Sequence, residues 1–164
     1  MATWIKKVNN HKLIIRRAKE EDAAGIKAVY KQQEKKFGHM RSWIKSIRLY
    51  PMIIYQIDKE IIGFTYFDFT AVKKEYWGKG IGTAILAAYI YEDRDGCPWD
   101  GRIVKEMYGR VIPMIKKLQT ELGLELKLEE NYFELRVEEG TSKSELNRRI
   151  EKFLEKNGWR KVEY

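Results

Sequence analysis

The chain of 164 residues contains few of the residues that build covalently or metal-stabilised folds. Its one cysteine, Cys97, excludes a disulfide within the chain, and this favours a reducing, cytoplasmic location. Because Cys97 adjoins Pro98, we interpret it as a loop residue rather than a nucleophile. The two histidines do not repeat the close spacing of a zinc site, so we expect no metal. No apolar run reaches eighteen residues and residues 1–10 lack the apolar core of a signal peptide, so we expect no membrane partner.

Positive charge is unevenly distributed. The net charge is +8, and residues 1–50 hold 13 Lys or Arg against 4 Asp or Glu, whereas residues 51–164 hold 19 against 20. A basic first third favours an anionic partner, and the alternative is a lysine-rich helix face in contact with solvent. The length and the 44% of hydrophobic residues suit one domain, residues 1–164, with a real core.

Hydrophobic periodicity predicts alternating strands and helices, which indicates an α/β (α+β) fold class. Pro113 lies inside one helical run and predicts a kink or a break there. Strands are expected at 12–18, 52–57, 61–72, 124–128, 133–137 and 159–164. Helices are expected at 20–37, 41–49, 83–91, 104–122 and 142–156.

The stretch 72–83 changes from strand periodicity to helix periodicity and carries glycines at alternate positions: Gly78, Gly80 and Gly82. Glycine lets a ligand approach the backbone closely, and the first turn of a helix offers unpaired N–H groups at the positive end of its dipole. A phosphate or pyrophosphate suits such a site. The spacing fits neither the Rossmann pattern nor the Walker loop. The alternative is a plain glycine-rich turn.

The same stretch resembles motif A of the GCN5-related N-acetyltransferases (the GNAT superfamily), R/Q-x-x-G-x-G/A after a small apolar triplet. Here the triplet is Thr70-Ala71-Val72 and the loop reads Trp77-Gly78-Lys79-Gly80-Ile81-Gly82. Tryptophan in place of Arg or Gln is similar to the ribosomal-protein N-terminal acetyltransferases.

A second stretch, 147–159, is similar to motif B of that family. Asn147, Phe153, Lys156, Gly158 and Trp159 fall in register with it. The resemblance covers about 12–30, 51–91 and 133–164, and implies a mixed, splayed β-sheet flanked by helices with a helical insertion at about 92–131. The insertion is either a packing element or a substrate lid or dimer element. Two strand runs lie between the second helix and motif A where the family has three, so either one strand is missing or 61–72 bends into two.

The resemblance implies transfer of an acetyl group from acetyl-CoA directly to a primary amine. The loop backbone would hold the pyrophosphate, and Ala71 and Val72 would contact the pantetheine arm and polarise the thioester carbonyl. The implied coenzyme A site comprises Ala71, Val72, Trp77, Gly78, Lys79, Gly80, Ile81, Gly82, Thr83 and Asn147.

The acid and base of this reaction are less clear in the sequence. Asp68 is the only acid in 61–72 and is the candidate base; the alternative is an acid at an exposed strand position. Many members of the family place a tyrosine beside the sulfur, and here that position is Leu154, which cannot donate a proton. Tyr108, Tyr132 and Tyr164 are the alternatives.

In the family the first two helices form much of the acceptor wall. Seven cations stand in this region against one acid, Glu34, so we expect an amine on an anionic molecule, such as an acidic peptide or a phosphorylated compound. The alternative functions are a non-catalytic acyl-CoA-binding module and a basic nucleic-acid-binding domain using residues 1–50. The cations are Lys27, Lys31, Lys35, Lys36, Arg41, Lys45 and Arg48.

Overall fold

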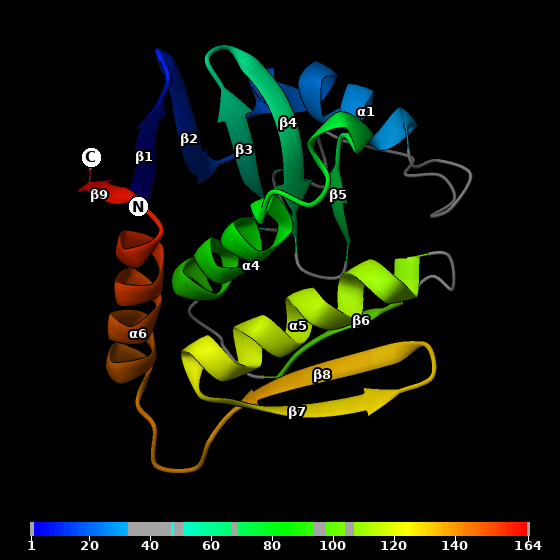
Figure 1. The fold of residues 1–164 in the computed structure, drawn as a ribbon, viewed down its shortest axis with the longest axis vertical. Coiled ribbons are helices and arrows are strands. Elements are labelled where there is room, and N and C mark those ends of the chain that lie inside the picture. Colours follow the sequence, from blue (N-terminus) through cyan, green and yellow to red (C-terminus); the bar gives the residue numbers. More distant parts are fainter. Residues whose placement is uncertain are drawn as a thin grey trace.

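A computed structural model describes residues 2–32, 47, 51–66, 69–93, 98–103 and 107–163. These residues form an α+β structure with two antiparallel sheets (Figure 1). The larger sheet has six strands in the order β5-β4-β3-β2-β1-β9. Its strands are β1 Ala2–Val8, β2 His11–Arg17, β3 Ile53–Ile57, β4 Glu60–Thr65, β5 Thr70–Val72 and β9 Arg160–Glu163.

Tight turns fix the register of the first hairpins. Asn9 and Asn10 both have positive φ, 51° and 63°, as a two-residue type I′ turn between β1 and β2 requires. Asp58, with φ 52°, lies between β3 and β4. Its carboxylate accepts hydrogen bonds from the Lys12 backbone N–H, 3.0 Å, and pairs with His11 Nδ1 at 2.8 Å. These contacts tie the β3–β4 turn to the start of β2.

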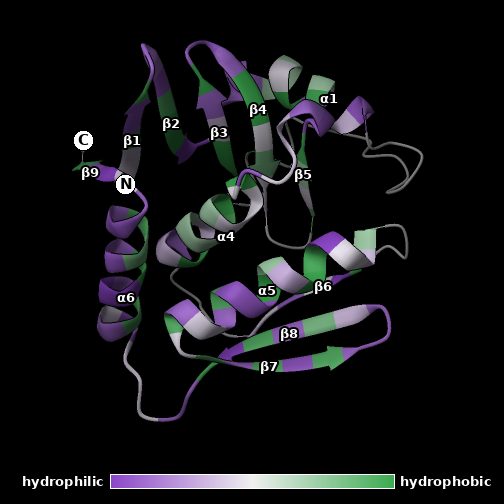
Figure 2. Cartoon of the chain, viewed as in Figure 1, coloured by the Kyte–Doolittle hydropathy of each residue, from purple (hydrophilic) through white to green (hydrophobic). Residues whose placement is uncertain are grey.

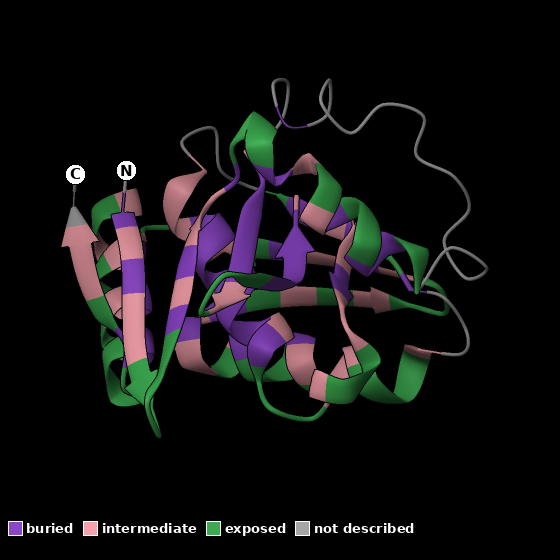
Figure 3. Cartoon of the chain, turned by 90° about the horizontal axis from the view of Figure 1, so that it is seen from above, coloured by how far each residue is buried: buried purple, intermediate pink, exposed green. Residues whose placement is uncertain are grey.

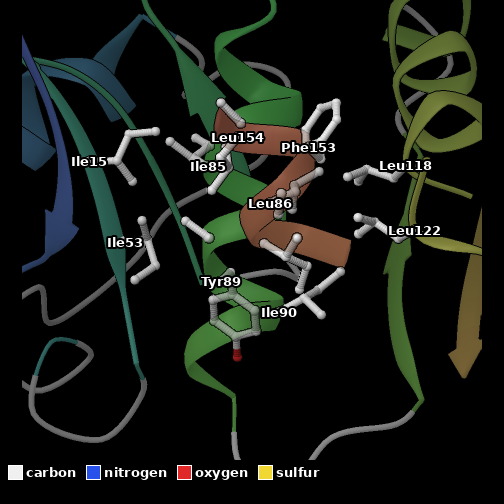
Figure 4. Close-up of a cluster of buried hydrophobic side chains, with 14 of the residues drawn as sticks. Ile15, Ile53, Ile85, Leu86, Tyr89, Ile90, Leu118, Leu122, Phe153 and Leu154 are labelled. Atoms are coloured by element: carbon white, nitrogen blue, oxygen red, sulfur yellow. The ribbon is translucent and has the colours of Figure 1, made fainter. Parts of the chain in front are cut away.

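Helices cover both faces of this sheet. Helix α1 (Ala23–Lys31) buries Ile26, Val29 and Tyr30 against one face, beside β4 and β5. Helix α4 (Ile81–Glu92) lies on the other face and is buried on nearly all sides, because α5 (Tyr108–Leu122) and α6 (Lys143–Lys156) also pack on it. Figure 4 shows α4 at the centre of this core, with sheet side chains on one side and α5 side chains on the other.

The smaller sheet has the order β6-β8-β7 and lies beyond α5 (Figure 1). Its strands are β6 Trp99–Arg102, β7 Leu124–Glu129 and β8 Tyr132–Val137. Hydrophobic and hydrophilic residues alternate along β7 and β8 (Figure 2), and the apolar face, with Leu124, Phe133 and Leu135, joins the core under α5. Figure 3 shows buried residues gathered in the middle strands of the larger sheet and exposed residues at the hairpin ends.

Most predicted elements are confirmed, and the run 61–72 does bend into two strands. β4 and β5 pair antiparallel, and the Tyr66 N–H donates to the Phe69 carbonyl at 3.2 Å. Three strands, β3, β4 and β5, therefore lie between α1 and the glycines. Helix α5 ends at Gly123, whose φ of 65° only glycine adopts easily, and it continues through Pro113 without the break that we considered. Strand β1 was not predicted, although Ala2 and Trp4 alternate as buried positions.

Two expectations about the sheet are wrong. The larger sheet is not mixed, because every strand pair among the described residues is antiparallel. The strand after α4, β6, pairs with β8 and not with β5. The segment 92–131 is also more than a helical insertion, since it supplies β6 and β7 to the smaller sheet. Of the predicted helix 41–49 only Ile47 is described, and it is helical and buried; Cys97 lies outside the described residues.

Candidate ligand-binding site

The segment that joins β5 to α4, residues 73–80, is the glycine loop. Gly78 and Gly80 have φ of 80° and 78°, and a Cβ at either position would have nothing within 4 Å. Gly80 is the N-cap of α4, and its carbonyl accepts the N–H of Ala84 at 3.1 Å. The N–H groups of the first turn have no acceptor within the helix. The loop therefore presents backbone donors to open space at the positive end of the α4 dipole.

Side chains on three elements hold the glycine loop in place. The indole Nε1–H of Trp77 donates to the Val72 carbonyl at 2.7 Å, and the Lys74 N–H donates to Gln32 Oε1 at 3.0 Å. The guanidinium of Arg110, at the start of α5, lies 4.7 Å from the centre of the Trp77 ring. The loop is thereby fixed to β5, α1 and α5 before any ligand arrives.

A cavity of about 460 Å³, the first cavity, lies beside the loop and within the range of small-molecule sites. Its walls come from β5, the glycine loop, the start of α4, β6, α5 and β8, and they are largely apolar. It holds three cations, Arg102, Arg110 and Lys117, and no carboxylate among its described lining residues. The lining is Thr70, Val72, Tyr76, Trp77, Gly78, Gly80, Ile81, Gly82, Thr83, Leu86, Arg102, Met107, Gly109, Arg110, Val111, Pro113, Met114, Ile115, Lys117 and Phe133.

Strand β5 borders this cavity with its outer edge, because among the described strands it pairs only with β4. Phe69 and Lys73 form backbone hydrogen bonds with Tyr66 and Ile62 of the neighbouring segment, and in an antiparallel pair every second residue bonds in this way. The backbone N–H and C=O groups of Thr70 and Val72 therefore point away from β4. Both residues line the cavity. The hydroxyls of Thr70 and Thr65 share a hydrogen bond of 2.7 Å beside it. An extended ligand could therefore run along this edge as a further strand would.

A smaller cavity of about 90 Å³, the second cavity, lies at the same end of α4. Gly80, Ile81, Thr83 and Lys117 border both cavities. The remaining lining comes from β1, β3, the glycine loop, α4 and the end of α6: Lys6, Tyr55, Lys79, Ala84, Phe153, Leu154, Asn157 and Trp159. The start of α4 thus faces one large apolar cavity and one small cavity with several polar groups.

The structure brings together most of the coenzyme A residues predicted from sequence. Seven of them line the first cavity, and Lys79 lines the second. Ala71 lines neither, since it is buried with Phe64 and Ile26 on the α1 side of the sheet. The seven are Val72, Trp77, Gly78, Gly80, Ile81, Gly82 and Thr83.

Asn147 also lines neither cavity. It lies two helical turns, roughly 10 Å, before Leu154 on α6, and its Oδ1 is buried with no hydrogen-bond partner among the described residues. Leu154 itself is fully buried and lines the second cavity. The candidate base Asp68 lies outside the described residues.

The alternative tyrosines lie elsewhere. The Tyr132 hydroxyl donates to Asp100 Oδ2 at 2.7 Å in the smaller sheet, Tyr108 lines neither cavity, and Tyr164 lies outside the described residues. Sequence reasoning missed the two α5 cations, Arg110 and Lys117. Their spacing of seven residues places them on one helix face, but nothing in the sequence indicates that this face meets the glycine loop.

Comparisons with models of protein families and with curated proteins gave no match to this chain. Within the described part of the chain, no helix has both the length and the apolar character needed to cross a membrane. The same residues contain no group of three or more His, Cys, Asp or Glu side chains placed to hold a metal ion.

Proposed function

We propose that the protein is an acetyl-CoA-dependent N-acetyltransferase with the GNAT type of fold around its glycine loop. One observation carries the proposal: a single apolar cavity is bordered at one place by backbone donors and cations near the start of α4, and at another by the outer edge of β5. Coenzyme A needs both parts, because its phosphates are anionic and its pantetheine arm is extended and rich in amides. The presence of three strands, β3, β4 and β5, before the loop supports the resemblance.

In this proposal the pyrophosphate lies on the first-cavity side of the loop. Gly78 and the first turn of α4 supply backbone donors, and Arg110 and Lys117 supply positive charge. The pantetheine arm follows Thr70 and Val72 along β5, with the apolar side chains of α5 on its other side. The pairing of β6 with β8 leaves this edge open, whereas the family resemblance implies a splayed neighbouring strand.

The reaction forms a C–N bond and breaks the thioester C–S bond. The attacking amine loses a proton, and the leaving thiolate gains one or is stabilised as an anion. Since the described lining of the first cavity holds no carboxylate, the base that we propose is Asp68, which precedes β5 by two residues. Backbone N–H groups at the edge of β5 would polarise the thioester carbonyl.

A second candidate is a non-catalytic acyl-CoA-binding module. It is favoured by Leu154, a fully buried leucine at the position where many family members carry a tyrosine. Both candidates bind the same cofactor, so turnover separates them.

The decisive experiment measures acetyl-CoA binding by thermal unfolding and calorimetry, then acetylation of a panel of amines by mass spectrometry. At a ligand concentration of 100 times Kd, linkage adds about 2.7 kcal/mol to the free energy of unfolding, or roughly 5–10 °C in Tm. Binding with acetylation supports the enzyme, whereas binding without acetylation of any amine supports the module. No shift at millimolar acetyl-CoA would contradict both.

A further inference from the structure

The second cavity contains a buried tyrosine with nothing to bind. Tyr55, on β3, is 6% exposed, and its ring packs edge-on against Trp159 with centroids 5.6 Å apart. Its hydroxyl makes no hydrogen bond to any described residue, and the hydroxyl oxygen is still accessible to solvent. Since Tyr55 lines the second cavity, the hydroxyl opens into it.

This hydroxyl is a donor at neutral pH. Burial raises the pKa of Tyr55 to about 12, so the phenol stays protonated over the physiological range. The protein supplies no acceptor for this donor, so the hydroxyl is available to a ligand in the cavity. Tyr55 is therefore a feature that points to a ligand independently of the helix end.

Three lysines surround the same small space: Lys6 from β1, Lys79 from the glycine loop and Lys117 from α5. None of them forms an ion pair with an acid among the described residues, and no carboxylate lines the second cavity. Two of them lie over aromatic rings: the Lys6 ammonium is 5.8 Å from the centre of the Trp159 ring, and the Lys79 ammonium is 5.4 Å from the centre of the Tyr76 ring. β1, β3, the glycine loop and α5 therefore each bring to this cavity a side-chain donor that has no acidic partner among the described residues. The start of α4 adds its backbone N–H groups.

We propose that the second cavity binds a phosphate group of the acceptor, so that the substrate is a primary amine that also carries a phosphate. The cavity, about 90 Å³, suits one tetrahedral anion and excludes the pantetheine arm. Tyr55 and Lys6 line it without lining the first cavity and are separate from the residues assigned to coenzyme A. Lys79, which the sequence assigned to coenzyme A, also lines only the second cavity. The statement that the ligand is an amine and is acetylated rests on the proposed function, whereas the phosphate site itself does not depend on it.

The first test uses inorganic phosphate with the whole chain and no cofactor, followed by calorimetry or ³¹P NMR. Phosphate should bind to the wild type, and Tyr55→Phe should weaken it about tenfold, since one hydrogen bond to a charged group is lost. Lys79→Ala should weaken it further. Tyr132→Phe and Lys127→Ala remove the same groups in the smaller sheet and should leave phosphate affinity unchanged.

Folding is a built-in control, because Tyr55→Phe removes a hydroxyl that has no partner. Its Tm without ligand should equal or exceed that of the wild type. A clear loss of Tm would show that the hydroxyl already has a structural partner, which overturns the proposal.

The second test separates the acceptor from the cofactor. Acetyl-CoA affinity should be unchanged in Tyr55→Phe, and phosphate should bind to the acetyl-CoA complex as well as to the free protein. O-phosphoethanolamine should be acetylated with a KM at least tenfold below that of ethanolamine, and Tyr55→Phe should remove this difference. Loss of the Tyr55-dependent phosphate binding in the acetyl-CoA complex would assign the cavity to the cofactor and overturn the proposal, as would absence of any phosphate binding that depends on Tyr55. Phosphate binding without any acetyl-CoA binding would refute the proposed enzyme while leaving the anion site intact.

Discussion

The indole Nε1–H of Trp77 donates a 2.7 Å hydrogen bond to the carbonyl oxygen of Val72, five residues earlier. This bond joins the two ends of the turn that leaves β5, and Arg110 lies over the same indole at 4.7 Å. One side chain thus connects the strand edge, the glycine loop and α5. These are three of the elements that border the first cavity.

Trp77→Phe keeps an aromatic ring for Arg110 and removes the N–H donor together with part of the ring surface. We expect the free energy of unfolding to fall by about 0.5–1.5 kcal/mol, and acetyl-CoA affinity to fall several-fold because the loop is less well held. Trp99→Phe is the matched control, since its indole donates to Asp93 Oδ2 at 2.8 Å away from the loop. Calorimetry on both variants checks this. Equal acetyl-CoA affinity in Trp77→Phe and wild type would show that the bond does not set the loop geometry.

Gly80→Asp tests the loop as a phosphate site. The side chain would stand in open space with its negative charge at the N-cap of α4, and φ of 78° would add strain of about 1–2 kcal/mol. We expect the variant to fold but to lose the rise in Tm with acetyl-CoA.

Gly140→Asp provides the control for backbone strain. Gly140 has φ of 88° with nothing within 4 Å, and it lies in the turn before α6. It should lower the Tm of the free protein by a similar amount and keep the full response to acetyl-CoA. If Gly80→Asp also kept that response, the phosphates would not lie at this helix end.

Local patterns in the sequence were enough to place most of the elements, because each pattern has a local physical cause. Asn157 and Gly158 end α6, with Gly158 at φ 92°, and the N–H of Glu145 bonds Ser142 Oγ at 3.0 Å at its start. Gly78 and Gly80 likewise have positive φ, which glycine adopts without the strain that a side chain would add. The residues next to them that were predicted to bind coenzyme A therefore lie together along the first cavity.

Strand pairing was not predictable in this way, because it depends on contacts between segments far apart in sequence. Strand β1 reads as a charged N-terminus with Lys6 and Lys7, but the turn at Asn9 folds it against β2 and β9 then adds to its other side. Tyr55 was overlooked for the same reason. Its strand is hydrophobic apart from Gln56, and only the packing of α4 and α6 shows that a cavity lies over Tyr55.

Asp22→Asn tests the ion pair between Asp22 and Arg16 at the start of α1. Arg16 donates to both carboxylate oxygens at 2.8 Å, and the Lys19 N–H donates at 2.7 Å. Burial raises the pKa of Asp22, but the hydrogen bonds and charges of Arg16 and Lys19 outweigh it and lower the pKa below its ordinary 3.8. The variant should lose about 1.5–3 kcal/mol of unfolding free energy at pH 7.

The sign of the pH dependence follows from this lowered pKa. The carboxylate stabilises the folded state above its unfolded pKa, and the stabilisation is lost as the pH falls through the folded pKa. Urea unfolding of both proteins should therefore give a constant difference at pH 5–7 that shrinks below about pH 4. A difference that persists undiminished at pH 2 would mean that packing, and not charge, accounts for the effect.

Leu154→Ala asks whether the reaction needs any group at this position of α6. Leu154 is fully buried among Phe153, Ile85 and the other core residues, so its truncation should cost about 2–5 kcal/mol of unfolding free energy (Figure 4). Leu154→Met conserves volume and should cost less than about 1.5 kcal/mol. Since leucine cannot donate a proton, neither change should alter kcat at temperatures where the variants are folded. If folded Leu154→Ala lost kcat by tenfold or more while Leu154→Met did not, the side chain would position the reacting groups.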